Sequence, residues 1–175
     1  METMIYFTSD TYFGRTSKAK SRKFSSSSEM NLEMINRWNS VVKETDIVYH
    51  LGNFAWDIIS AEQMLLNLNG NINFLPSYSD TALLVIADNF ENLKIIDNSV
   101  YCIENQNLVV SPWRMFTWPA KRSGSIHLHG GDTRYKANLN KESRFNTNCE
   151  LWSLTPISLN SLNEVIEMTK EINDD

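Results

Sequence analysis

The side chains best suited to chemistry are carboxylates and imidazoles that stand beside expected strands. Asp10 follows the first of these strands, and His127 and His129 alternate within another, so both imidazoles point to the same face. Asp10, His129 and Asp132 could together form a single-metal site, since carboxylate and imidazole groups bind divalent ions. A structural zinc site, however, needs four well-placed ligands. We favour a structural role for Asp10 as a short hydrogen-bond acceptor in the turn after its strand.

The cationic side chains form a second group with a clear chemical use. Arg15 opens the densest positive segment of the chain, and Arg114 follows a Ser-Pro-Trp sequence in another expected loop. A guanidinium group can bind phosphate in bidentate fashion without a metal ion. A run of charge is more often a solvated face, so we weigh a phosphate-binding cleft against a solvated basic rim. The other members of this basic group are Lys18, Lys20, Arg22, Lys23, Lys121, Arg122, Arg134, Lys136, Lys141 and Arg144.

Five short motifs occur in order along the chain and give a more specific signal. They read Thr-Ser-Asp-Thr-Tyr-Phe-Gly at 8–14, Tyr-His-Leu-Gly-Asn-Phe at 49–54, Ser-Tyr-Ser-Asp at 77–80, Ser-Pro-Trp-Arg at 111–114 and Gly-Gly-Asp-Thr at 130–133. In this order and spacing they resemble the calcineurin-like metallophosphoesterase family, most closely its short bacterial and phage subgroup. The resemblance covers nearly the whole chain. It implies a single domain over residues 1–175 with an α/β fold, the four-layer α/β/β/α sandwich of that family.

The same resemblance implies a two-metal site, and most of its ligands are replaced in this chain. Asp10 keeps a ligand residue type, whereas the bridging carboxylate becomes Asn53 and the catalytic histidine becomes Ser79. Pro112 and Gly131 offer no side-chain donor at all. The positions that the resemblance assigns to metal binding or catalysis are Asp10, Tyr12, Asn53, Tyr78, Ser79, Pro112, Gly131 and Thr133.

These replacements remove the chemistry of such a site. Two divalent ions roughly 3.5–4 Å apart lower the pKa of a bound water and clamp the phosphoryl oxygens, and they require anionic or imidazole ligands. The phenols of Tyr12 and Tyr78, with an ordinary pKa of about 10, stay protonated without a metal ion. Ser79 cannot protonate a leaving group near neutral pH as histidine does. We therefore expect a catalytically inactive relative that holds no metal and no cofactor.

Binding is then the expected role. We expect Arg15, Arg114, Trp113 and His129 to line the emptied cleft and to contact a protein partner, or else a nucleotide or phosphate ligand. A phage origin would fit interference with a host factor. The alternative is a weak metal-dependent phosphodiesterase with the rebuilt single-metal site described above. The formal net charge of −5 argues against general nucleic-acid binding, which usually needs a basic surface.

Composition indicates an ordinary globular chain. Hydrophobic residues make up 42% and charged residues 21%, values typical of a compact domain. No stretch is long and apolar enough to span a bilayer, so we expect no membrane contact and a cytoplasmic location, possible also in a host cell. Cys102 and Cys149 are expected to be reduced thiols, because the first strand begins too near Met1 to leave room for a secretion signal.

Hydrophobic periodicity and capping signals place these motifs on alternating strands and helices. We expect Ser26, Ser60 and Ser161 to begin three helices, each with Glu or Gln three residues later, and Asp80 to cap a fourth. The residues from Arg15 to Lys23 are expected to form a loop, and Asn105 to Asn107 a hairpin tip. The expected strands span residues 4–9, 46–51, 72–75, 93–96, 100–103, 108–110, 126–129 and 145–152.

Overall fold

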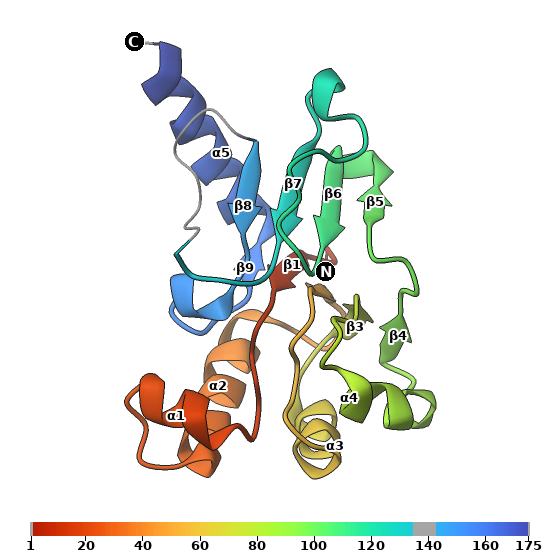
Figure 1. Ribbon diagram of the computed structural model, residues 1–175, viewed down its shortest axis with the longest axis vertical. Coiled ribbons are helices and arrows are strands. Elements are labelled where there is room, and N and C mark those ends of the chain that lie inside the picture. The colour runs from red at the N-terminus through yellow and green to blue at the C-terminus, as the bar shows by residue number, and fades with distance from the viewer. Residues whose placement is uncertain (1, 135–142, 175) are drawn as a thin grey trace.

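The computed structural model describes residues 2–134 and 143–174 as two mixed β-sheets with α-helices, which confirms the α/β class (Figure 1). The first sheet has the order β4 (Leu93–Ile95), β3 (Asn71–Phe74), β2 (Ile47–His50), β1 (Ile5–Thr8) and β9 (Ile157–Ser158). The second has the order β5 (Tyr101–Ile103), β6 (Leu108–Ser111), β7 (Ile126–His129) and β8 (Arg144–Asn146). β9 and β5 are antiparallel to their neighbours, and the other pairs are parallel.

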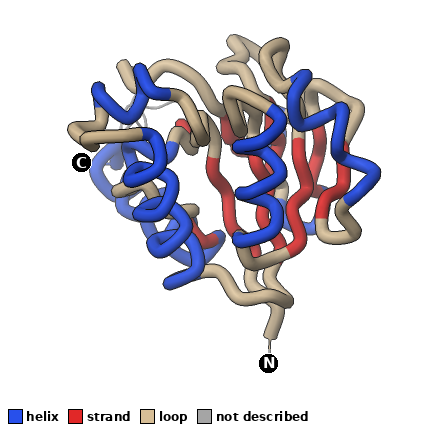
Figure 2. The backbone as a smooth tube through the Cα atoms, turned by 90° about the horizontal axis from the view of Figure 1, so that it is seen from below, coloured by secondary structure: helices blue, strands red, loops and turns tan. Residues whose placement is uncertain are grey.

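The helices are distributed unevenly about these sheets. They are α1 (Thr16–Ser21), α2 (Ser27–Val41), α3 (Ile58–Asn67), α4 (Thr81–Ile86) and α5 (Leu159–Asp174), with the short 3₁₀ turns η1 (Ala87–Asn89), η2 (Glu104–Gln106), η3 (Lys121–Ser123) and η4 (Cys149–Leu151). Helices α1 to α4 lie at the first-sheet end of the molecule, and α5 runs beside β8 (Figure 1). Figure 2, seen from the helix end, shows helices lying over the strands and running roughly along them.

Two hydrophobic clusters hold these layers together. One joins the helix-facing side of the first sheet to α2, α3 and α4, with Trp38, Met34 and Phe54 almost fully buried. The other fills the space between the sheets, where Phe7 and Leu51 of the first meet Val110 and Leu128 of the second. Fully burying such a side chain stabilises a fold by about 1.5–3 kcal/mol. Strands β1, β2 and β6 are therefore buried along nearly their whole length.

The capping residue predicted from the sequence is confirmed for one helix and wrong for two. Ser26 caps α2, its hydroxyl accepting a hydrogen bond from the Glu29 amide at 3.1 Å. Ser60 does not cap α3, because Asp57 stands at the N-cap and accepts from the Ser60 amide at 2.8 Å. In the last helix Ser158, not Ser161, accepts from the amide three residues later. In both cases another good capping residue lies three positions upstream, so the pattern was misread by one turn.

Other expectations are partly corrected. The segment Arg15–Lys23 is not a plain loop, because it contains α1. The expected strand over 145–152 is shorter, since β8 ends at Asn146 and η4 follows. The expected hairpin tip is confirmed as η2 between β5 and β6. Cys102 is exposed and Cys149 buried, and both are free thiols. Among the described residues, no helix is long and apolar enough to cross a bilayer.

Candidate functional site

The motif loops converge because the strands that precede them are parallel. Ser9–Phe13 follows β1, Leu51–Ala55 follows β2, and Leu75–Asp80 follows β3, so all three leave the first sheet at the same edge. The loops after β6 and β7 arrive at this edge from the second sheet. A Cβ atom added at Gly52 would meet Ser77 Cβ at 2.9 Å and Pro112 Cβ at 3.2 Å, so the three loops touch.

A small hollow of about 270 Å³ lies where these loops meet. Its lining is polar and includes two carboxylates and one ammonium group. The lining residues are Asp10, Tyr12, Lys18, Asn53, Gly131, Asp132, Thr133 and Asn148. The structure therefore brings together most of the positions that the motifs single out. Tyr78, Ser79 and Pro112 do not line it, and Tyr78 is 90% exposed, its ring tilted against that of Trp113 with centroids 5.0 Å apart.

Asp10 is the centre of a hydrogen-bond network on the floor of this hollow. Its Oδ1 accepts from Asn53 Nδ2 at 2.8 Å. Its Oδ2 accepts from the Ser9 hydroxyl and from the Gly131 amide, each at 2.7 Å. Burial raises the pKa of the Asp10 carboxyl, and the hydrogen bonds from Gly131, Ser9 and Asn53 oppose that rise. Both carboxylate oxygens are thus already engaged by neighbours within the protein.

Asn53 extends the network across the floor. Its Oδ1 accepts from the hydroxyls of Ser79 at 2.6 Å and Ser77 at 3.0 Å, while its Nδ2 faces Asp10. A bridging carboxylate at this position would place two like charges side by side unless cations lay between them. The amide instead supplies one donor and one acceptor. Asn53 therefore links Asp10 to Ser79, the position at which the motif resemblance implies a catalytic histidine.

Asp80 ties the second and third motif loops together, a role that the sequence did not indicate. It does stand at the N-cap of α4, but its side chain makes no capping bond there. Its carboxylate accepts instead from the amides of Asn53, Phe54 and Ser77 at 2.7–2.9 Å. The expected capping role is therefore wrong. From sequence alone, an aspartate that caps a helix cannot be distinguished from one that links two loops.

The loops of the floor hold an unusual backbone. Asp10, Tyr12 and Asn53 have φ of 58°, 50° and 59°, in the left-handed region that non-glycine residues seldom occupy. Such residues persist only where the surroundings hold them, and they gather at functional sites. Here the amides of Asp10 and Tyr12 donate to the carbonyls of Gly52 and Asn53 at 2.9 Å. The first two motif loops therefore hold each other in this conformation.

Two of the expected rim cations are instead part of the interior. The Arg22 side chain is only 5% exposed, and it donates to the carbonyls of Asp10 and Thr11 at 2.7 and 2.6 Å. Glu150 accepts from both Arg22 and Lys18. Nothing in the sequence separates Arg22 from its cationic neighbours. Arg144 is likewise buried in β8, where Nη1 donates to the Met115 carbonyl at 2.8 Å. The expected positions Lys136 and Lys141 lie outside the described residues.

The donors that face the hollow do not suit a pair of divalent ions. Burial, with the charge of Asp10, raises the pKa of Tyr12 to about 12, so its phenol stays neutral. Asp132 is engaged by Arg134, whose Nε lies 2.7 Å from Oδ2. Lys18 adds a positive charge that repels cations. Within residues 2–134 and 143–174, no three His, Cys, Asp or Glu side chains gather as metal ligands do.

The histidines are also engaged in the structure. His129 Nδ1 lies 2.8 Å from the Gly130 carbonyl, and its ring lies on that of His127, which confirms that the two share a face. Burial lowers the pKa of His129 to about 4. Burial lowers the pKa of His50 to about 3, and its Nε2 lies 3.0 Å from the Thr11 hydroxyl. His129 does not line the hollow and does not join Asp10 and Asp132 there.

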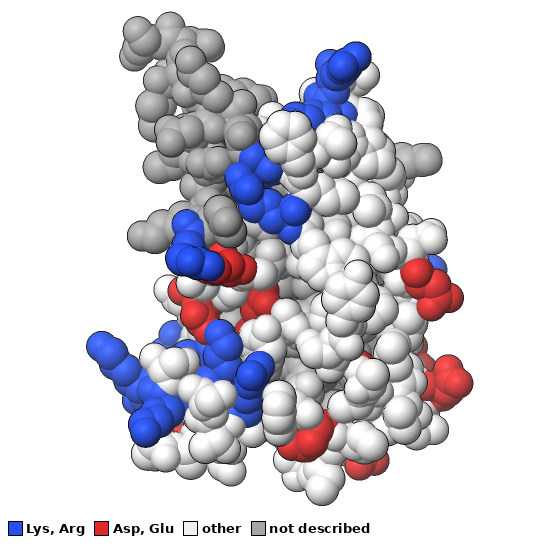
Figure 3. Space-filling model, in the orientation of Figure 1, with Lys and Arg blue, Asp and Glu red and all other residues white. Residues whose placement is uncertain are grey.

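The expected binding residues are divided between two surfaces. Arg15 lies between two rings at the rim, with Cζ 5.0 Å from the Tyr12 centroid and 4.7 Å from that of Trp56. Arg114 belongs to the loop over the second sheet, which is the segment between β6 and β7. Burial lowers the pKa of His127 and of His129, and the charge of Arg114 lowers both further. Neither guanidinium lines the hollow. Figure 3 shows Lys and Arg groups both below and above a patch of acidic side chains.

An apolar groove continues from the rim between α3 and α4. It encloses about 660 Å³ and is lined by Asp57, Ile58, Ile59, Thr81, Ala82 and Val85. Trp56, next to it in the chain, is 61% exposed, and Ile59 and Val85 are more exposed still. Exposed apolar side chains such as these gain free energy when a partner covers them. Sequence reasoning missed this surface, because scattered isoleucines and valines on two short helices read as core.

Comparison with known proteins places the chain in a family. No family model matches it. A solved structure, a protein of unknown function, AQ665, from Aquifex aeolicus, shares the fold with a TM-score of 0.69 and 18% identity, covering 94% of this chain and all of the other. The uncharacterized protein MJ1445 of Methanocaldococcus jannaschii is 30% identical over 178 residues, covering 96% of this chain and 94% of that protein. The chain therefore belongs to the same family as MJ1445.

Proposed function

We propose that this protein is a catalytically inactive, metallophosphoesterase-like protein that acts by binding a protein partner. The observation that carries the proposal is the Asp10–Asn53–Ser79 chain of hydrogen bonds, which occupies the floor where the motif resemblance implies two metal ions. The convergence of five motif loops on one edge supports the resemblance. The two sheets, with helices α1 to α4 on one side and α5 beside β8, support the family's four-layer sandwich as the ancestral architecture.

The rim offers what protein recognition requires. Trp, Tyr and Arg supply most of the binding energy at protein interfaces, and Trp56, Tyr78 and Arg15 all lie at or beside the rim. Stacking between Tyr12 and Trp56 holds the Arg15 guanidinium in place before a partner arrives. The partner would insert apolar side chains into the α3–α4 groove and offer an acidic group to Arg15.

A capture experiment tests the binding role. Immobilised protein is exposed to an extract of the source organism, and bound proteins are identified by mass spectrometry. We expect one partner that is recovered by the wild type and lost with the Trp56→Ala, Tyr78→Ala double variant. Arg15→Glu should weaken recovery on its own. Lys94→Gln changes an exposed residue of β4 and serves as the matched control. Equal recovery by all variants would place the interaction elsewhere.

A phosphodiesterase assay tests the proposal that the protein is catalytically inactive. A chromogenic phosphodiester is offered with Mn²⁺ to the wild type and to Asp10→Asn, which changes one oxygen of the floor to nitrogen. We expect the two rates to be equal and at the level of the buffer. Turnover that depends on Mn²⁺ and disappears in Asp10→Asn would support the weak phosphodiesterase instead.

A further inference from the structure

The loop over the second sheet differs in charge from the rest of the chain. Between Glu104 and Asp132 the sequence has no Asp or Glu, yet it includes Arg114, Lys121 and Arg122. This stretch is therefore positively charged, whereas the whole chain carries a formal net charge of −5. The upper half of the face in Figure 3 shows Lys and Arg in separate groups with uncharged surface between them.

Internal hydrogen bonds fix the shape of this loop. Trp118 Nε1 donates to the Ser125 carbonyl at 3.1 Å, and the Ser125 hydroxyl donates to the Pro119 carbonyl at 2.6 Å. Ala120 and Gly124 are in the left-handed region on either side of η3, with φ of 55° and 87°. The loop is also tied to the sheet, because the Met115 amide donates to His127 Nε2 at 3.2 Å.

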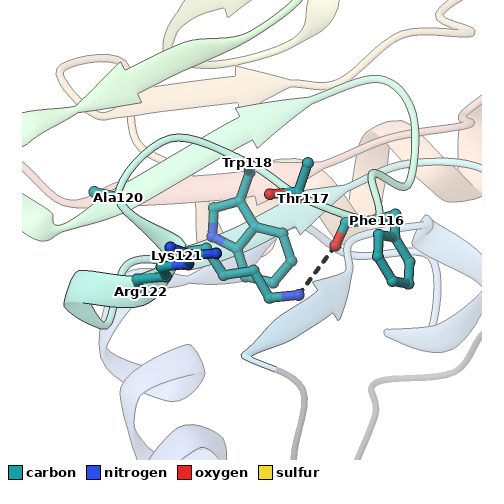
Figure 4. A pocket seen from close by; sticks show the side chains of 6 residues that line it. All are labelled: Phe116, Thr117, Trp118, Ala120, Lys121 and Arg122. Atoms are coloured by element: carbon teal, nitrogen blue, oxygen red, sulfur yellow. Dashed lines mark hydrogen bonds between the residues drawn. The ribbon is translucent and has the colours of Figure 1, made fainter.

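A groove of about 620 Å³ runs along this loop (Figure 4). Its lining residues are Phe116, Thr117, Trp118, Ala120, Lys121 and Arg122. The Lys121 Nζ lies 4.4 Å from the Trp118 ring centroid and 5.4 Å from that of Phe116, and it donates to the Phe116 carbonyl at 3.0 Å. The Phe116 ring is 85% exposed. An ammonium group is thus held beside a flat ring that is open to solvent.

A buried cation lies beneath the same groove. The Arg144 guanidinium carbon is 5.9 Å from the Trp118 centroid. Burial and the charge of Arg114 lower the pKa of Arg144, which shows that the two guanidinium groups act on each other. A charge shielded from water by an aromatic ring is screened less by salt than a surface charge. Trp118 thus lies beside both Lys121 and Arg144.

We propose that this groove binds a short segment of single-stranded nucleic acid. One base stacks on Phe116, and the neighbouring phosphates contact Lys121 and Arg122. An aromatic platform beside cations that follow the backbone is how sequence-tolerant single-strand sites work, and a volume of this size accommodates a nucleotide. A base can cover the exposed flat ring, whereas the carboxylates of an acidic peptide cannot. The preference is for a single strand, because the base faces of a duplex are already stacked on one another and cannot cover the Phe116 ring.

Fluorescence anisotropy with a 5′-labelled oligo(dT) of eight nucleotides at about 20 mM salt tests the proposal. We expect saturable binding that weakens at 200 mM salt, because phosphate contacts release counterions. Phe116→Ala should weaken it at least fivefold, the lower end of what base stacking contributes, whereas Phe116→Trp should retain it. Lys121→Gln should weaken it more than Lys94→Gln, which removes the same charge on β4. The melting temperature of each variant confirms that it is folded.

Four outcomes would overturn the proposal. One is no saturable binding at low salt. Another is unchanged affinity in Phe116→Ala, which would mean that the oligonucleotide is held by nonspecific charge attraction alone. A third is equal binding of thymidine monophosphate, which would make the site one for free nucleotides. The last is equal competition by a polyglutamate peptide, which would indicate an acidic protein. The Trp56→Ala, Tyr78→Ala variant should bind the oligonucleotide normally, so this test and that of the proposed function succeed or fail separately.

Discussion

The floor of the hollow and the surfaces around it contrast in how they use polar groups. On the floor, the Asn53 side chain donates to Asp10, and Asp80 accepts from the Asn53 backbone amide, so these side chains are engaged by neighbouring loops. On the rim and on the loop over β6 and β7, aromatic rings stand exposed beside Arg15 and Lys121. A group bonded inside the protein is costly to turn toward a ligand, whereas an exposed ring gains by being covered. We therefore propose that binding occurs outside the hollow.

The largest effect on the floor is expected from Asn53→Asp, which places a second carboxylate beside Asp10. The new carboxylate would face Asp10 without a donor between them, and we expect the free energy of unfolding at pH 7 to fall by about 4 kcal/mol. The two carboxyls would raise each other's pKa, so the penalty is present above the raised pKa and relieved as the pH falls through it. Urea unfolding of wild type and variant at pH 7 and pH 4.5 measures the difference.

A matched control exchanges the two residues. In Asp10→Asn, Asn53→Asp the donor and the charge change places, and Ser77 and Ser79 still have an acceptor. We expect this variant to regain at least half of the stability lost by Asn53→Asp. No recovery would mean that the floor is held by something other than this hydrogen bond.

Acidification tests the buried histidines beneath both regions. The pKa of His50 is lowered to about 3 and that of His129 to about 4, so the unfolded chain binds protons that the native fold rejects. Stability is therefore full above pH 6.5 and is lost as the pH falls toward 4, by about 3 kcal/mol for each of the two histidines. His50→Phe should flatten this dependence, because its ring packs among Trp38, Phe54 and Phe74. An equal slope in that variant would contradict the account.

The sequence was most informative where a signal is local. Short runs of apolar residues predicted the strands, and the motif at 49–54 singled out Asn53, which lies on the floor of the hollow. The burial of Arg22 could not be read from it, since that depends on Glu150 and on the Asp10 carbonyl meeting the same guanidinium across the fold. The α3–α4 groove and the separation of Arg15 from Arg114 likewise depend on how distant segments pack. Contacts between distant segments leave no periodic trace in a chain.

Truncations on the rim should change stability little. Tyr78→Ala removes a ring that is exposed and stacked only at its face on Trp113. We expect the free energy of unfolding to change by less than about 1 kcal/mol, roughly 2–4 °C in melting temperature. Differential scanning fluorimetry would show it. A drop of ten degrees would make the rim part of the structural core and remove its contrast with the floor.

Metal dependence tests the central claim most directly. Hydrogen bonds hold the floor, so no stoichiometric Mn, Fe, Ni or Zn should remain after purification, and the melting temperature should be the same in EDTA and in 1 mM Mn²⁺. A ligand that binds only the folded state stabilises it by mass action, so an unshifted melting temperature means no such binding. Elemental analysis and thermal unfolding give both answers on one sample. Near-equimolar metal, removed by chelator with a loss of many degrees, would contradict the account.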